Sequence, residues 1–131
     1  AKMAKLLPVS APFHCSLMKP AQDRLEADLN ALKMQKPVYP VICNFEASPV
    51  TDALEARRTL GAQVTGSVKW EQSMRLLIDQ GVQTFIEIGP GKVLFGLMRQ
   101  IDRSKTCVNV GDEASLTKAV EQFEKSAAMS S

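Results

Sequence analysis

The sequence has few of the residues that bind metals, and it lacks the patterns of membrane and nucleic-acid-binding proteins. Its 131 residues include one histidine and three cysteines without a C-x-x-C pair, which argues against a zinc site. Lysine and arginine total 16 against 14 acidic residues, so the net charge of +2 is far from a basic nucleic-acid footprint. No apolar run reaches the roughly 18 residues of a membrane span, and the first ten residues do not form a secretory signal. We expect a cytoplasmic protein with reduced thiols and no metal, cofactor, nucleic acid or membrane among its ligands.

What is present is ordinary globular composition, with 45% hydrophobic and 23% charged residues. The length suits one domain. Apolar residues recur at helical spacing in five segments, and three short runs are rich in β-branched residues. The predicted helices cover 17–34, 52–63, a segment from Trp70 ended by Gly81, a segment from the Gly89-Pro90-Gly91 turn to Ile101, and a segment capped by Asp112; the predicted strands cover 41–45, 84–88 and 107–110.

Alternating strands and helices predict an α/β fold with parallel strands. Three strands make a thin sheet, which suggests that further strands come from chain outside this sequence. An exposed strand at 84–88 would then be a surface prone to association. Ser48-Pro49 is predicted to be a turn, and residues 127–131 a frayed tail.

The single histidine, His14, is the first candidate for chemistry. It follows an apolar run at 6–9 and precedes the first helix, and α/β proteins place active sites where a strand ends and a helix begins. Imidazole also suits proton transfer near neutral pH. The alternative is a structural histidine that caps the helix or fills the edge of the core. Cys15 beside it suggests a cysteine-histidine pair, although a small buried thiol is the simpler interpretation.

Other candidate motifs are weak. No G-x-S-x-G nucleophile elbow occurs, because Thr65 and Lys69 stand where its glycines would be. Gly89-Pro90-Gly91-Lys92 resembles a phosphate loop, but Val93 replaces the Ser or Thr that the motif needs, which favours a rigid turn. The arginines at positions 57, 58, 99 and 103 suggest a mildly basic face for an acidic partner, or merely a solvated surface.

Three segments in order resemble the malonyl-CoA:acyl carrier protein transacylases, relatives of polyketide acyltransferase domains. They are VSAPFHCSLMKPA (9–21), QVTGSVKWEQSM (63–74) and FIEIGPGKVLFGLMRQI (85–101). The resemblance implies an α/β-hydrolase-like core with a short parallel sheet flanked by helices. Residues 1–131 would be its C-terminal part, following a ferredoxin-like insert. It also implies transfer of malonate from malonyl-CoA to the phosphopantetheine thiol of acyl carrier protein, through an acyl-serine, in fatty acid synthesis.

The resemblance also implies roles for three residues. The S-A-P-F-H segment matches the family's catalytic-histidine motif, so His14 would be base and acid in both half-reactions. The backbone carbonyl of Gln63 would hold its second ring nitrogen. Phe13 would line the acyl pocket, with a slight preference for malonyl over methylmalonyl groups.

The chain departs from the family by lacking the nucleophile serine, the oxyanion hole and the arginine that binds the malonyl carboxylate. We therefore expect it to be a fragment that is inactive alone and that needs a complementing N-terminal half. Two alternatives stay open: a non-catalytic module that binds acidic acyl carrier protein through its arginines, and an unrelated small α/β protein.

Overall fold

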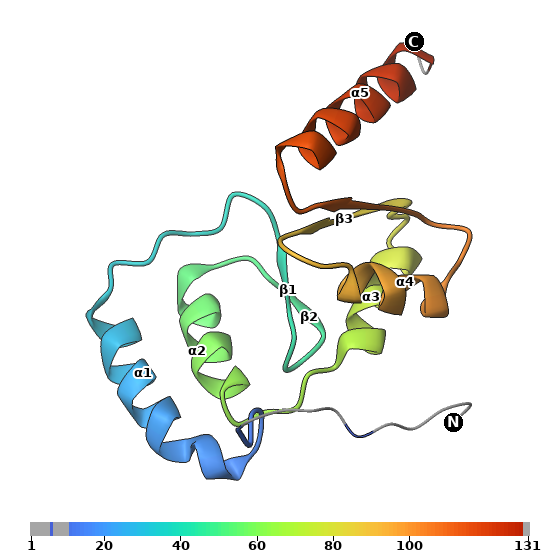
Figure 1. Ribbon diagram of the computed structural model, residues 1–131. Helices are drawn as coiled ribbons and strands as arrows, with labels where there is room; N and C mark the ends of the chain where they lie inside the picture. The colour runs from blue at the N-terminus through green and yellow to red at the C-terminus, as the bar shows by residue number, and fades with distance from the viewer. Residues whose placement is uncertain (1–5, 7–10, 130–131) are drawn as a thin grey trace. The chain divides into compact units, whose positions relative to one another are not determined.

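The computed structural model describes Leu6 and residues 11–129 (Figure 1). The chain forms two compact units, Ala1–Ser73 and Met74–Ser131. Most of the apolar run at 6–9, which precedes His14 in the sequence, lies outside the described residues. Within the part that the structure describes, no helix is long and apolar enough to cross a membrane.

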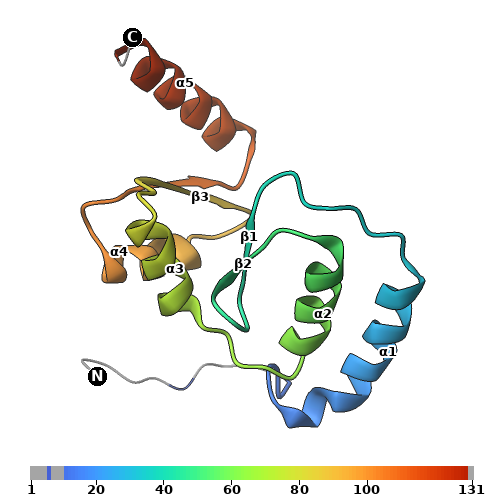
Figure 2. The same cartoon turned by 180° about the vertical axis from the view of Figure 1, so that it is seen from behind.

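Two helices dominate the first unit. A 3₁₀ turn, η1 (Ser16–Met18), leads into α1 (Lys19–Ala31), and α2 (Ala53–Gln63) begins at Asp52. The Asp52 carboxylate accepts a hydrogen bond from the backbone N–H of Glu55 at 2.9 Å, the usual N-cap geometry. The two helices contact each other and lie side by side in both views (Figures 1 and 2). Leu29 of α1 and Thr59 of α2 are buried. The helices predicted over 17–34 and 52–63 are therefore confirmed, the first with shorter ends.

A hairpin connects these helices. β1 (Val41–Cys43) pairs antiparallel with β2 (Ser48–Val50), with Val41 opposite Val50. The prediction of a turn at Ser48-Pro49 is wrong. The chain reverses earlier, where Ala47 adopts a φ of 52° and its N–H donates to the Cys43 carbonyl at 3.0 Å. Proline is compatible with a strand that is not fully paired, because such a strand does not need every N–H.

The second unit holds a parallel strand pair. α3 (Trp70–Asp79) precedes this pair in the chain, and β3 (Thr84–Ile88) pairs in parallel with β4 (Thr106–Val110). α4 (Val93–Ile101) contacts both strands, and α5 (Glu113–Met129) contacts β4. The buried apolar side chains of this unit are those of Met74, Met98 and Ala119.

Single capping residues explain where α3 ends and where α5 begins. Gly81 ends α3 with a φ of 90°, which a glycine adopts without strain. At the start of α5, the Asp112 carboxylate accepts from the Ser115 N–H at 2.8 Å, and the Ser115 hydroxyl oxygen accepts from the Asp112 N–H at 3.0 Å. This reciprocal cap is the capping-box arrangement.

Two further expectations differ from the structure. The strand predicted at 41–45 does not join the parallel sheet, because β1 takes β2 as its hydrogen-bonded neighbour. The parallel sheet of the described residues therefore has two strands rather than three. Residues 127–129, assigned to a frayed tail, form the last turn of α5, since the strong helix former alanine fills two of these positions.

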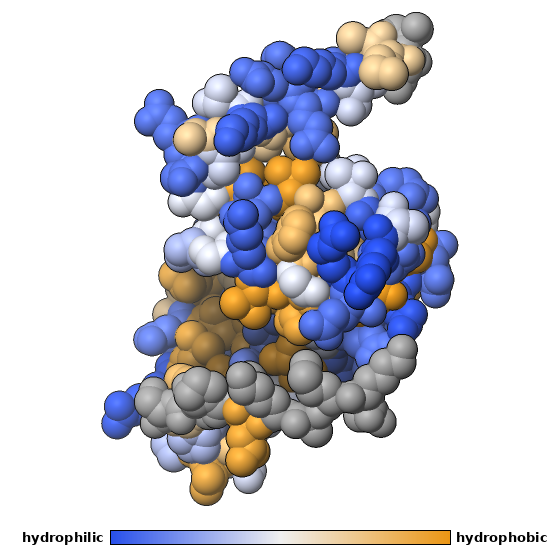
Figure 3. Space-filling model, turned by 45° about the vertical axis from the view of Figure 1, so that its right-hand side comes forward, coloured by the Kyte–Doolittle hydropathy of each residue, from blue (hydrophilic) through white to orange (hydrophobic). Residues whose placement is uncertain are grey.

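The second unit leaves one side of β3 exposed. Alternate residues of this strand face solvent, with Ile86 48% and Ile88 83% exposed. Figure 3 shows apolar surface, in orange, between hydrophilic side chains on the face in view. The residues of such a strand are normally covered on both faces in a parallel sheet, so this unit has an uncovered apolar face.

Candidate active site

The candidate site is built on the tight turn that precedes η1. The Phe13 N–H donates to the Ala11 carbonyl at 2.9 Å, and the next residue, His14, has a φ of 58°. The left-handed region is uncommon for residues other than glycine, although histidine enters it more readily than most. Left-handed backbone geometry at a non-glycine residue is typical of functional sites, where surrounding contacts maintain it. The imidazole is exposed, so His14 is not a histidine of the core.

The ring of His14 contacts the end of α2. Its Nδ1 lies 3.0 Å from the backbone carbonyl oxygen of Gln63, a residue 49 positions away. Gln63 is the last residue of α2, where carbonyl groups have no partner within the helix. A carbonyl oxygen only accepts, so Nδ1 carries the proton in this contact. The neutral ring then has its free lone pair on Nε2, which is the arrangement a general base requires.

The residues on either side of His14, Phe13 and Cys15, do not share its contact with Gln63 in the hydrogen bonds that the structure gives them. The Cys15 thiol is half-buried and donates to the Pro12 carbonyl at 3.1 Å, so this contact engages the thiol with backbone rather than with the imidazole. Phe13 is 57% exposed, and its role in an acyl pocket stays a prediction. Catalytic roles for His14 and Gln63 also stay predictions, although the His14 side chain contacts the Gln63 backbone as the resemblance implies.

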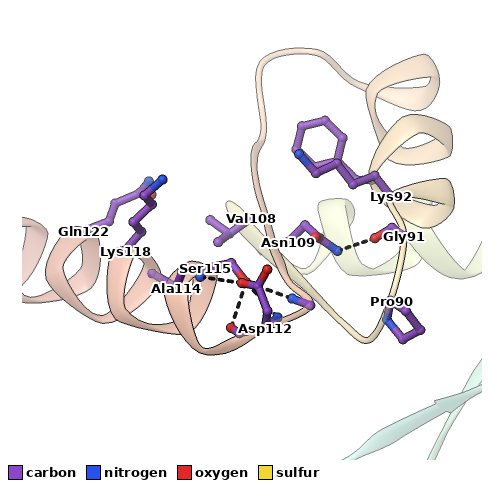
Figure 4. Close-up of a pocket in the computed structure, with 13 residues that line it drawn as sticks. Pro90, Gly91, Lys92, Val108, Asn109, Asp112, Ala114, Ser115, Lys118 and Gln122 are labelled. Carbon is purple, nitrogen blue, oxygen red and sulfur yellow. Dashed lines mark hydrogen bonds between the residues drawn. The ribbon is translucent and has the colours of Figure 1, made fainter.

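The turn after β3 lines a pocket of about 600 Å³ at the carboxyl ends of β3 and β4 (Figure 4). Three of its polar side chains, Asn109, Asp112 and Ser115, make hydrogen bonds within the protein. The Asn109 amide donates to the Gly91 carbonyl at 2.7 Å, and the Asp112 carboxylate bonds to Ser115 (Figure 4). These contacts support a rigid turn rather than a phosphate loop.

A carboxylate already occupies the N-terminus of α4. Glu87 on β3 accepts from the backbone N–H of Leu94 at 3.1 Å and of Phe95 at 2.9 Å. Lys92, the N-cap residue, makes no capping hydrogen bond through its side chain. The N–H groups that would bind a phosphate are therefore used by Glu87.

The arginines are mostly engaged as well. Arg57 on α2 donates to the Leu32 carbonyl at 2.8 Å. Arg58 pairs with Glu46 at 2.8 Å and with Glu55 at 2.6 Å, and the hydrogen bond from Arg58 lowers the pKa of the Glu46 carboxyl. Arg99 lies over the ring of Phe95, 5.9 Å from its centroid. Within the described residues, no cluster of three His, Cys, Asp or Glu side chains could hold a metal ion.

Comparison with known proteins finds relatives with similar sequences and similar structures. No protein-family model matches the chain. Over 122 residues, 93% of this chain, it is 40% identical to the malonyl CoA-acyl carrier protein transacylase of Salmonella typhimurium, and over 125 residues it is 39% identical to that of Bacillus subtilis. The solved structure of the Clostridium perfringens transacylase is similar over 95% of the chain, with a TM-score of 0.87 and 36% identity. Over the part it spans, the chain is similar in sequence and fold to malonyl CoA-acyl carrier protein transacylases.

The similarity to these transacylases covers part of each relative. The chain spans 40% of the length of the Salmonella typhimurium protein and 39% of that of Bacillus subtilis. Another similar structure, with a TM-score of 0.83 and 38% identity, is a malonyl-transacylase in complex with a type II PKS acyl-carrier protein. The fold of this chain is α/β-hydrolase-like, with a short parallel strand pair and an antiparallel hairpin.

Two structural features of this chain cannot be predicted from its sequence. Glu87 caps a helix that begins six residues later, and no capping motif signals a contact that crosses from a strand. Thr65 contacts Gln22 across 43 residues, and nothing in the local sequence around either residue indicates this pair. Both contacts depend on tertiary packing.

Proposed function

We propose that this chain supplies the catalytic histidine of a malonyl-CoA:acyl carrier protein transacylase. The observation that carries the proposal is the contact between His14 Nδ1 and the Gln63 carbonyl, in a chain 40% identical to a named transacylase. This contact leaves Nε2 free to exchange a proton. A histidine held at Nδ1 by an acceptor is the arrangement that activates a serine in acyl transfer.

The proposed reaction has two halves. In the first, Nε2 takes the proton of a serine hydroxyl as the oxygen attacks the malonyl thioester, and the leaving coenzyme A sulfur receives that proton. In the second, Nε2 takes the proton of the phosphopantetheine thiol, whose sulfur attacks the acyl-serine, and the proton returns to the serine oxygen. The Gln63 carbonyl keeps the same ring orientation throughout, because it can accept from Nδ1–H in both charge states of the ring.

The serine, the oxyanion hole and the carboxylate-binding arginine would come from outside this chain. We assign residues 1–131 to the C-terminal part of the large subdomain, with an N-terminal part as complement. The chain's span of 40% of its Salmonella typhimurium relative supports this division. Malonyl-CoA and acyl carrier protein are the proposed substrates, and Phe13 the proposed acyl-pocket residue. We expect the protein in the cytoplasm, where its three free cysteines would stay reduced.

A chimera tests the proposal. This chain would replace the 122 matching residues of the Salmonella typhimurium transacylase, and transfer of labelled malonate from malonyl-CoA to acyl carrier protein would be measured. His14→Ala should lower kcat by about 10²- to 10⁴-fold, the usual contribution of a general acid-base. Gln63→Ala should stay near the parent rate, since the contact is through the backbone.

The isolated 131-residue chain should show no transfer. Transfer by that chain alone, or a folded chimera in which His14→Ala retains full activity, would contradict the proposal. The alternative of a module that binds carrier protein through its arginines has less support, because Arg57 and Arg58 are engaged with groups of the chain itself.

A further inference from the structure

We propose that Thr65 and Gln22 are positioning residues for His14, because they hold the end of α2 that presents the Gln63 carbonyl. This inference rests on the proposed role of His14. Its structural part, the coupling of Thr65 to the orientation of the imidazole, has a test that does not require enzymatic activity.

A series of hydrogen-bonded side chains connects α1 to the residues that follow α2. The Thr65 hydroxyl donates to the Gln22 side-chain oxygen at 2.9 Å, and the Gln22 amide nitrogen donates to a carboxylate oxygen of Glu26 at 2.6 Å. All of these groups are partly buried. A hydrogen bond shielded from water, with a charged acceptor next in line, restrains its partners more than an exposed one.

Glu26, the last residue of this hydrogen-bonded series, is fixed by close packing between α1 and α2. The side chain of Glu26 lies over Gly61, a buried residue of α2. A Cβ at Gly61 would come within 3.0 Å of Glu26 Cγ and 3.1 Å of its Oε1. The absence of a side chain at Gly61 thus allows Glu26 to approach α2, and it keeps the carboxylate within reach of Gln22.

The hairpin loop holds the same segment through a second contact. Gly66 lies directly against the ring of Phe45, where a Cβ would come within 2.0 Å of a ring carbon. The Gly66 N–H also donates to the Ala62 carbonyl at 3.0 Å. The residues after α2 are therefore held by contacts with both Gln22 and Phe45.

This placement matters because the contact between His14 and Gln63 is exposed. An exposed hydrogen bond competes with water, so its occupancy depends on how well both partners are positioned beforehand. Thr65 is two residues from Gln63, and planar peptide units leave few rotatable angles between them. Loss of the Thr65 hydroxyl bond would therefore let the Gln63 carbonyl turn away from the imidazole.

The test uses His14 as its own reporter, since it is the only histidine of the 131-residue chain. Ring ¹⁵N chemical shifts, measured where the imidazole is neutral, give the ratio of the Nδ1–H to the Nε2–H form. In Thr65→Val, which keeps the shape but loses the hydroxyl, we expect this ratio to fall by about two- to fivefold, a change that partial loss of one hydrogen bond would produce. Thr65→Ser should restore it, and Gln22→Ala should lower it in the same way.

Thr59→Val is the matched control. Thr59 is buried in α2 and its hydroxyl donates to the Glu55 carbonyl at 2.8 Å, so this variant loses a hydroxyl from the helix that ends at Gln63 without touching the Gln22 connection. It should change stability but not the ratio. An unchanged ratio in a folded Thr65→Val chain, or an equal fall in Thr59→Val, would overturn the inference. A fall confined to Thr65 and Gln22 variants, with an inactive chimera, would sustain the structural coupling and reject the proposed enzymatic role.

Discussion

The carboxylate of Glu87 should make a large contribution to the stability of the second unit. It joins β3 to the first turn of α4 through two backbone N–H groups, at 3.1 Å and 2.9 Å. The residue is half-buried, and the N-cap position of α4 makes no side-chain hydrogen bond of its own. Glu87 thus replaces the missing cap and also places a negative charge at the positive end of the helix dipole.

The magnitude follows from these two effects. A lost N-cap costs about 1 kcal/mol, and a lost charge at a helix N-terminus about 0.5 to 1 kcal/mol. Glu87→Ala removes both, so the free energy of unfolding should fall by about 2 kcal/mol. Glu87→Gln keeps one acceptor oxygen and loses the charge, so it should cost about 1 kcal/mol.

Urea unfolding would measure this loss, and amide hydrogen exchange at Leu94 and Phe95 would locate it. Exchange at these two N–H groups should quicken by about five- to thirtyfold in Glu87→Ala, the factor that corresponds to one or two kcal/mol. Glu121→Gln makes the same chemical change at an exposed position of α5 and should stay within about 0.5 kcal/mol of the parent. If Glu87→Gln were no more destabilising than Glu121→Gln, the capping argument would be refuted.

Three other substitutions have definite expected outcomes. Gly66→Ala should cost about 1 to 3 kcal/mol in thermal unfolding, because its Cβ would overlap the Phe45 ring, and adding Phe45→Ala should recover part of the loss if the overlap is the cause. Gly91→Ala should cost about 1 kcal/mol, since the φ of 84° is strained for alanine, whereas Gly96→Ala on α4 should not destabilise the chain. Hydrogen bonds from Ser115 lower the pKa of Asp112 below 3.8. The stability that they add is therefore present above pH 3.8 and is lost as the pH falls through the lowered pKa. Ser115→Ala should flatten this acid dependence of the free energy of unfolding in urea titrations between pH 5 and 2.

Local signals predicted most of the helices and the parallel strands. Asp52 and Asp112 are capping residues directly before apolar periodic segments, and Gly81 follows one, so the sequence around each helix end contains its own boundary. The β-branched runs at 84–88 and 107–110 were likewise sufficient to predict β3 and β4.

The hairpin could not be predicted in the same way. Ser48-Pro49 has the composition of a turn, yet it forms β2, and the actual turn uses Ala47 in a left-handed conformation that alanine rarely adopts. Pairing between β1 and β2 satisfies their backbone groups locally, which removes β1 from the parallel sheet. The choice between the two pairings depends on tertiary structure, which a short apolar run does not specify.

The candidate site shows why the end of a helix can matter as much as a side chain. His14 is recognisable by its residue type, but its acceptor is a backbone carbonyl, so the residue type at position 63 carries no information about the contact. What selects that carbonyl is the point at which α2 ends. Because an α-helix has 3.6 residues per turn, an end shifted by one residue would direct the last free carbonyl about 100° away from the imidazole. Thr65 and Gly66, which have the composition of an ordinary turn, are the residues that hold this end in place, and they therefore act on the proposed chemistry through backbone geometry.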